Sequence, residues 1–252
     1  MEKQKPEVKK EKQEEGRYVY CVVDKAVNFD TAGIEESKVY SIPYKDICAI
    51  VHACEAKPYK SDNNEEVKTW IISHQKVIDK ASQGTTVIPL TFDMIIKGSD
   101  NKVLEWLKKE YENLKKKIEK IKEKQEFGIQ IFWNTKIIAS KLDIEEIKEL
   151  KNEMTKTGKG KAYFYEQKIK NILRKELEKK ADQYFKDFYS LIKKYSDEIK
   201  VEKLKEDNML ANFSCLVERN KVKELGIKLD KINKLEGFSV RFTGPWSPYS
   251  FV

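Results

Sequence analysis

The chain has 252 residues and a mass of 29.6 kDa, which fits one large domain or two modest ones. Charged residues make up 37%, and 50 Lys and Arg against 42 Asp and Glu leave a net charge of +8. No apolar run reaches the ~18 residues of a membrane span. Residues 1–16 also lack the apolar region of a secretory signal, so we expect neither a membrane protein nor a secreted one.

The N-terminal part alternates strands with one amphipathic helix. Residues 1–16 contain five Lys, five Glu and almost no apolar side chain, so we expect a disordered charged tail. From Arg17 onward, runs of β-branched, aromatic and apolar residues predict short strands. Apolar positions that recur every three or four residues predict a helix, which Asn63 or Asn64 caps. The expected elements are strands at 18–23, 39–42, 47–51 and 85–88 and a helix at 65–82.

Two long helices carry narrow apolar seams in otherwise charged surroundings. In residues 102–125 the apolar positions step by three and four from Leu104 to Ile121, and a second helix over 162–200 has the same spacing from Leu177 to Tyr195. Each seam is roughly 26 Å long at ~1.5 Å per residue. We therefore expect the two helices to pack together, or each of them to meet a partner.

The remaining elements complete an α+β chain. We expect strands at 127–133, 209–217 and 238–242, a helix at 144–153 capped by Asp143, and a helix at 220–235. In the second half the order is strand, two helices, strand, helix, strand, which resembles a split βαβ (ferredoxin-like) unit. The predicted organisation is a tail at 1–16, an α+β domain at 17–125, a ferredoxin-like domain at 126–243 and an extension at 244–252.

No arrangement of residues predicts an enzyme or a cofactor. The basic loop Gly158–Lys161 lacks the spacing of a phosphate-binding loop. His52, Cys54, Cys48 and His74 are the few metal-ligating candidates, and their spacing fits no zinc module. There is no GxSxG, and the two histidines limit any catalytic dyad. The four cysteines form no CxxC pair, which favours free thiols in a reducing cytoplasm. We expect no enzyme, no cofactor and no small-molecule substrate; a metal or thiol enzyme is the third hypothesis.

A basic nucleic-acid-binding module is the alternative function. Residues 102–126 hold nine Lys and six Glu, and the interleaved acids interrupt any continuous positive track. Arginine, which supplies most contacts to base edges, occurs only four times. The charge is therefore more typical of a solvated surface, and we expect no nucleic-acid partner.

The last nine residues are the most unusual local sequence. Gly244-Pro245 and Ser247-Pro248 restrict the backbone, so the segment is expected to be stiff and extended. Trp246, Tyr249 and Phe251 add large apolar groups. Two interpretations remain open: the segment folds back and fills its own core, or it is a rigid aromatic anchor for a partner.

At this segment the chain resembles the gas vesicle accessory proteins of the GvpF/GvpL family, whose members end in a sequence similar to GPWPPYSFV. Pro89–Asp93 resembles the family's PLRFG stretch, with Thr91 and Asp93 in place of arginine and glycine. The other matches are Tyr18–Tyr20, His74, Glu126–Ile129, Gly160–Tyr163 and Met209–Val217.

The resemblance implies a non-enzymatic cytoplasmic protein that acts in the assembly of gas vesicles, which are gas-filled protein shells. It implies two α+β domains, the second a modified ferredoxin-like fold with long helices and a C-terminal extension. The expected partners are the small hydrophobic shell protein and other accessory proteins. The residues expected to bind a partner or dock the domains are Pro89, Leu90, Phe92, Gly244, Pro245, Trp246, Pro248, Tyr249 and Phe251.

Overall fold

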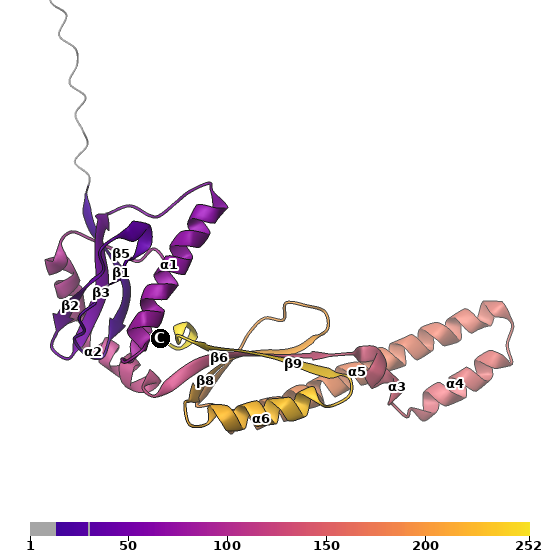
Figure 1. The fold of residues 1–252 in the computed structure, drawn as a ribbon. Coiled ribbons are helices and arrows are strands. Elements are labelled where there is room, and N and C mark those ends of the chain that lie inside the picture. Colours follow the sequence, from indigo (N-terminus) through magenta and orange to yellow (C-terminus); the bar gives the residue numbers. More distant parts are fainter. Residues whose placement is uncertain (1–13, 30) are drawn as a thin grey trace, which may run out of the picture. The chain divides into compact units, whose positions relative to one another are not determined.

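The computed structural model describes residues 14–29 and 31–252 and divides the chain into two compact units. Unit 1 runs up to Glu123 and also includes Ser247–Val252, whereas unit 2 comprises Lys124–Trp246. The chain therefore leaves unit 1 once and returns to it at its end (Figure 1). No helix in the described part is long and apolar enough to span a membrane.

Unit 1 is built on an antiparallel sheet whose central strand β1 is buried from its second residue onward. The strand order is β2-β3-β1-β4, and β5 also pairs with β1. The elements are β1 (Glu15–Val23), the short helix η1 (Ile34–Glu36), β2 (Tyr40–Tyr44), β3 (Ile47–Glu55), α1 (Asn64–Ser82), β4 (Val87–Pro89), β5 (Ile95–Lys97), α2 (Asp100–Ile121) and the C-terminal turn η2 (Tyr249–Phe251).

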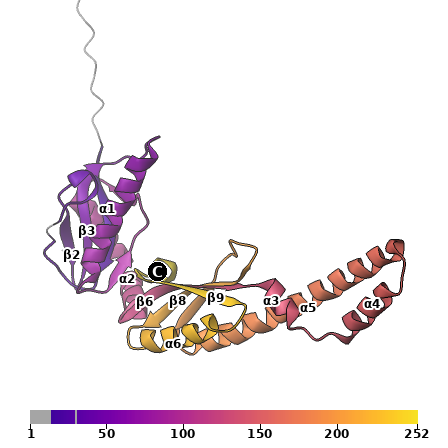
Figure 2. The same ribbon diagram turned by 45° about the vertical axis from the view of Figure 1, so that its right-hand side comes forward.

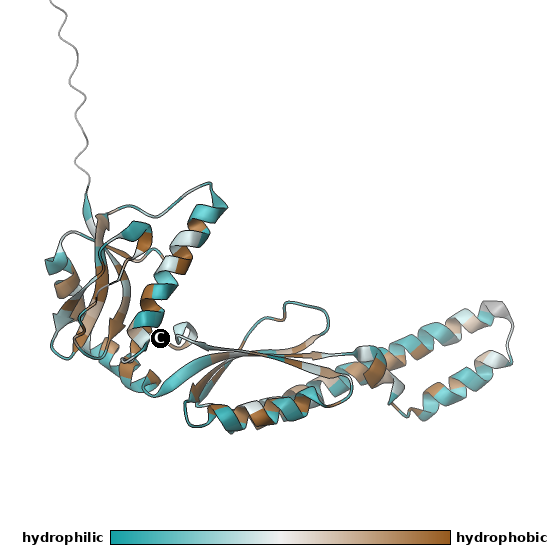
Figure 3. Cartoon of the chain, in the orientation of Figure 1, coloured by the Kyte–Doolittle hydropathy of each residue, from teal (hydrophilic) through white to brown (hydrophobic). Residues whose placement is uncertain are grey.

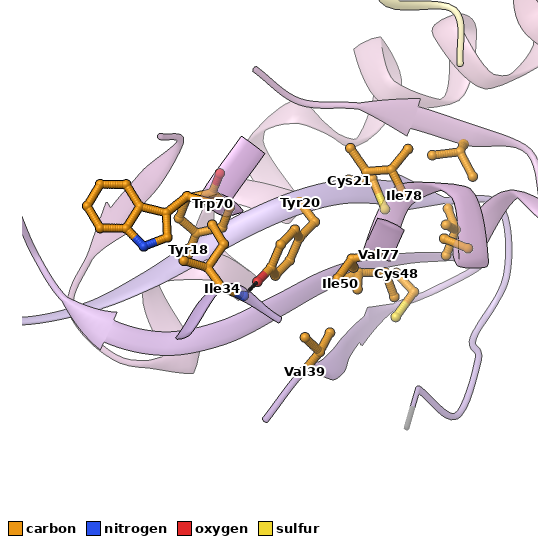
Figure 4. Packing of buried hydrophobic residues seen from close by; sticks show 13 residues of the cluster. Tyr18, Tyr20, Cys21, Ile34, Val39, Cys48, Ile50, Trp70, Val77 and Ile78 are labelled. Carbon is orange, nitrogen blue, oxygen red and sulfur yellow. Dashed lines mark hydrogen bonds between the residues drawn. The ribbon is translucent and has the colours of Figure 1, made fainter. Parts of the chain in front are cut away.

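Helix α1 covers one side of β1, and the residues between them form the main core of the unit (Figures 2 and 4). Tyr18 and Tyr20 of β1 pack with Trp70, Val77 and Ile78 of α1. The helix begins where the Asn63 side chain accepts a hydrogen bond from the backbone of Glu65, as its sequence predicted.

The apolar seam of α2 belongs to the core of unit 1 itself. Helix α2 contacts all five strands of the sheet, and Leu107, Leu114, Ile118 and Ile121 are buried there. Tyr111 is only half-buried, and its hydroxyl donates to Asp46. The seam therefore fills an intradomain interface and is not left unpaired for a partner helix. The predicted spacing is confirmed from Leu107 onward, whereas at the start of the seam Val103 is buried and Leu104 only half-buried. An amphipathic helix covering a sheet gives the same period as a coiled-coil helix.

Unit 2 contains a second antiparallel sheet, with the order β7-β8-β6-β9. Its elements are β6 (Lys124–Trp133), α3 (Thr135–Ser140), α4 (Glu145–Thr155), α5 (Lys159–Lys193), β7 (Glu198–Val201), β8 (Met209–Glu218), α6 (Val222–Asn233) and β9 (Phe238–Trp246). Phe188 and Ile192 of α5 and Leu225 and Leu229 of α6 share one core cluster with alternate residues of β6 and β8. The C-terminal half of helix α5 thus packs on the sheet, while α4 lies beside the N-terminal half of the same helix (Figure 1). Hydrophilic and hydrophobic residues are interspersed along α4 and α5 (Figure 3).

Several predicted boundaries are wrong for identifiable reasons. Strand β1 begins at Glu15, so the expected tail is too long by two residues. Residues 1–13 of the expected tail lie outside the described residues. Strand β2 continues through Pro43 because it is an edge strand, where a missing N–H costs no ladder bond. Helix α2 ends at Ile121, so that β6 begins at Lys124.

Other differences concern the second half. Helix α4 starts after Ile144 rather than at Asp143, which instead pairs with Lys148. The predicted helix 162–200 begins earlier and ends at Lys193, and residues beyond it form strand β7. Strand β5 and the short helix α3 were not predicted, because three to six residues are too few for a periodic pattern to emerge.

Candidate functional site

His74 lies at the centre of a buried hydrogen-bond network in unit 1. The backbone N–H of Asp93 donates to the Tyr18 hydroxyl at 3.1 Å, and this hydroxyl in turn donates to His74 Nδ1 at 2.8 Å. Nε2 of His74 lies 3.2 Å from the carbonyl oxygen of Leu90, which can only accept, so Nε2 carries the proton. The strand residue Tyr18, the helix residue His74 and the segment after β4 are thus locked together.

The C-terminal segment joins the same network. The Tyr249 hydroxyl lies 3.3 Å from His74 Nε2 and 3.2 Å from Gln75 Oε1, so it accepts from the imidazole and donates to the amide. Phe251 is only 3% exposed, and its carbonyl oxygen accepts from Lys120 Nζ at 3.1 Å. We call the segment Ser247–Val252 the clasp, because these contacts hold it on unit 1.

The network is electrically neutral at physiological pH. Burial lowers the pKa of His74 to about 4, outweighing the Leu90 carbonyl, which raises it. Burial likewise raises the pKa of Tyr18 and of Tyr249. Both ring nitrogens of His74 are engaged, and no described cluster holds three or more His, Cys, Asp or Glu side chains in metal-binding proximity. The arrangement is suited to holding segments in place rather than to proton transfer on a substrate.

The structure divides the predicted site residues between the two units. Pro89 ends β4, Leu90 contributes its carbonyl to His74, and Phe92 packs on the main core of unit 1. Pro248, Tyr249 and Phe251 also belong to unit 1, whereas Gly244, Pro245 and Trp246 are the last residues of β9 in unit 2. Of the predicted site residues, Leu90 and Tyr249 therefore meet at His74.

The expectation of a uniformly extended C-terminal strip is wrong. Gly244 to Trp246 extend β9, but Tyr249–Phe251 form a helical turn. Gly244 has φ +122°, and a Cβ there would lie 2.9 Å from both the Glu126 carbonyl oxygen and Phe127 Cδ1. Phe251 is buried, while Trp246 is 55% exposed. The core-filling role thus falls to Phe251, and Trp246 does not fill the core.

The sequence did not identify three of these contact residues. Tyr18 is predicted as a strand residue and as one of the matches to the family, and no pattern singles out Gln75 or Lys120. In the structure Tyr18 bonds to His74, Gln75 bonds to Tyr249, and Lys120 bonds to the Phe251 carbonyl. The one available signal was the position of His74 on the apolar face of its helix, because a buried imidazole needs hydrogen-bond partners. The second histidine, His52, is also buried and bonds to Tyr20 and Tyr59, and Asp93 connects Tyr59 to Tyr18.

The likeness to known proteins extends over most of the chain. It is 29% identical over 255 residues to gas vesicle protein L1 of Halobacterium salinarum, covering 94% of this chain and 90% of that relative. It is 26% identical over 238 residues to gas vesicle protein L of Haloferax mediterranei, covering 89% and 74%.

Solved structures share the fold. The crystal structure of gas vesicle protein GvpF from Anabaena matches with a TM-score of 0.76 at 19% identity, covering 94% of this chain and 97% of the other. GvpF from Microcystis aeruginosa matches with a TM-score of 0.67 at 18% identity, covering 94% and 98%. The family model described as gas vesicle synthesis protein GvpL/GvpF matches residues 16–252. The chain therefore belongs to the GvpL/GvpF family of gas vesicle synthesis proteins.

Proposed function

We propose that this protein is a non-enzymatic accessory factor in gas vesicle assembly, and that it binds the small hydrophobic shell protein, other accessory proteins, or both. The carrying observation is the family match over residues 16–252. The neutral, fully bonded network around His74 supports a structural role for the residues that resemble the family. We place the protein in the cytoplasm, in association with gas vesicles.

The physical task would be to shield apolar surface. A shell protein with a dry inner face exposes apolar groups before assembly, which is an aggregation hazard. Unit 1 presents two large exposed apolar side chains on α1, Ile71 at 47% and Ile72 at 54%. They lie within one turn of Gln75, which holds the clasp. We therefore place the docking of the shell protein on unit 1.

The charged helices would keep such a complex in solution. Exposed basic side chains pair with nearby carboxylates, as in Lys68–Glu65, Lys102–Glu105 and Arg174–Glu178. Paired charges favour solubility without building one continuous positive surface. This arrangement supports an assembly factor over the nucleic-acid alternative, which needs a continuous positive surface.

We also propose that the two units are separate domains and that unit 2 is a modified ferredoxin-like domain. In the order β7-β8-β6-β9 the first and third strands of the unit, β6 and β8, lie at the centre. The connection from β6 to β7 runs through α3–α5, and the connection from β8 to β9 runs through α6. This split βαβ connectivity, with an enlarged first crossover, supports the assignment.

The test is co-purification of the full chain with the shell protein, using one surface change on each unit. Ile72→Lys places a charge on α1, and Ile227→Lys is the matched control, because Ile227 on α6 is 51% exposed. We expect Ile72→Lys to reduce retention of the shell protein about tenfold and Ile227→Lys to leave it unchanged, with equal melting temperatures. Loss of retention only in Ile227→Lys would place docking on unit 2. The full chain is needed because cutting between the units would remove the clasp from unit 1.

A further inference from the structure

Unit 1 contains a cavity of about 450 Å³ that the network around His74 does not use. Four segments line it: η1, the end of β3, the loop that follows β3, and the first half of α1. Its walls include Glu35, His52, Tyr59, Glu66 and Trp70. This volume is within the range of small-ligand sites.

The floor of the cavity is rigid and uncharged. The Tyr20 hydroxyl accepts from the backbone N–H of Ile34 at 3.0 Å, as Figure 4 shows, and lies 2.8 Å from His52 Nδ1. His52 Nε2 lies 3.0 Å from the Tyr59 hydroxyl, so both ring nitrogens are engaged. His52 is 1% exposed, and burial lowers its pKa to about 4. The imidazole therefore adds no positive charge to the cavity at neutral pH.

Two aromatic side chains line the cavity, the half-buried Tyr59 and Trp70, of which 7% is exposed. The rings of Tyr59 and Trp70 meet edge to face, with centroids 5.3 Å apart. The backbone N–H of Tyr59 donates to Asp93 Oδ1 at 2.9 Å, which fixes the loop that carries it. Aromatic faces of this kind attract cations.

The rim carries one net negative charge. Three carboxylates line the cavity, those of Glu35, Glu55 and Glu66, against the ammonium groups of Lys57 and Lys60. Lys57 is already held by Glu55, with Nζ and Oε2 2.5 Å apart. The charge of Glu35 reaches the Tyr59 hydroxyl, where it adds to the effect of burial in raising the pKa. Glu35 and Glu66 thus line the cavity together with Tyr59 and Trp70, and the ammonium groups of Lys57 and Lys60 oppose their charge only in part.

We propose that this cavity binds a basic side chain, the guanidinium of arginine or the ammonium of lysine, from a protein partner. The cation would stack on Tyr59 or Trp70 while its N–H groups donate to Glu35 and Glu66. The inference does not depend on the proposed gas vesicle role, because the chemistry is the same whichever protein supplies the side chain.

The test uses the full chain and small probes, so its outcome is separate from binding of the shell protein. The probe is N-acetyl-arginine methylamide, and its neutral and acidic counterparts are the corresponding citrulline and glutamate derivatives. The chain has four tryptophans, and their indole N–H signals can be followed in ¹H–¹⁵N spectra. We expect the arginine probe to shift the Trp70 signal and the other two probes to leave it in place.

A matched pair of variants tests the carboxylates. Glu66→Gln removes a charge from the cavity, and Glu65→Gln removes one from the neighbouring residue, which does not line the cavity and pairs with Lys68. We expect Glu66→Gln to lower the affinity of the chain for the arginine probe about threefold and Glu65→Gln to leave this affinity unchanged. An equal shift with citrulline, stronger binding of the glutamate probe, or equal affinities in the two variants would each overturn the proposal.

Discussion

Removing the Phe251 side chain should destabilise unit 1 substantially. Phe251 is 3% exposed, and truncation of a buried phenylalanine in a core costs about 3–5 kcal/mol. If the six-residue clasp detaches while the rest of unit 1 stays folded, the variant loses no more stability than the contacts of the clasp supply. Burial of the ring supplies about 2–3 kcal/mol, and the hydrogen bonds of Tyr249 and of the Phe251 carbonyl add about 1 kcal/mol each against the cost of ordering the segment. We therefore expect Phe251→Ala to cost about 2–3 kcal/mol.

Calorimetry of the full chain measures this change. A loss of 2–3 kcal/mol in a unit of this size lowers the melting temperature by about 10 °C. Trp246→Ala is the control, because this larger ring is 55% exposed and belongs to β9; it should lower the transition of unit 1 by less than about 3 °C. Amide exchange gives a second readout, since the Tyr249 and Phe251 N–H groups bond within the clasp and should lose protection in Phe251→Ala. An unchanged transition in Phe251→Ala, or a larger loss in Trp246→Ala, would refute the assignment of the clasp as part of the core.

Three further predictions concern pH, a glycine and the seam of α2. Burial lowers the pKa of His52 and His74 from 6.5 to about 4, so the unfolded chain binds more protons between these values, and stability should fall as the pH drops from 6.5 towards 4. The melting temperature should therefore change less between pH 7 and pH 5 in His74→Gln than in the unmodified chain. An equal change in both proteins would count against a neutral His74. Gly244→Ala should destabilise the chain by about 1–3 kcal/mol, because Gly244 has a positive φ and the Glu126 carbonyl lies close to it. Gly226 lies in the interior of α6 with open space around it, so Gly226→Ala should stabilise the chain by up to ~1 kcal/mol. Urea titrations of both variants measure these changes. Leu107→Ala should cost about 2–5 kcal/mol without altering the oligomeric state measured by light scattering, because its side chain is buried within unit 1; dissociation of an oligomer would instead indicate that α2 packs on a partner.

Local sequence patterns predicted those elements whose conformation depends mainly on their own residues. The α+β class, the helix at α1 with its Asn63 cap, and the long strands β1, β3, β6 and β8 follow from periodicity and strand-forming runs. Hydrophobic spacing also identified the seams of α2 and α5, but it could not say what covers them, because a sheet and a partner helix impose the same period. The short strand β5 gave no signal, since its structure depends on pairing with β1 and on packing against α2, which lie far from it or outside its own residues.

The candidate site shows the same division. The sequence by itself singled out Tyr249 and Phe251 as members of an unusual C-terminal segment and His74 as a polar residue on an apolar helix face, and the resemblance to the family added Leu90. Only the tertiary structure decided that Leu90 and Tyr249 meet at His74, that Phe251 rather than Trp246 is buried, and that Ser247–Val252 return to unit 1. These outcomes depend on contacts between residues up to 175 positions apart. Composition and local spacing carry no information about such pairs, because burial and hydrogen bonding are settled when the whole chain packs.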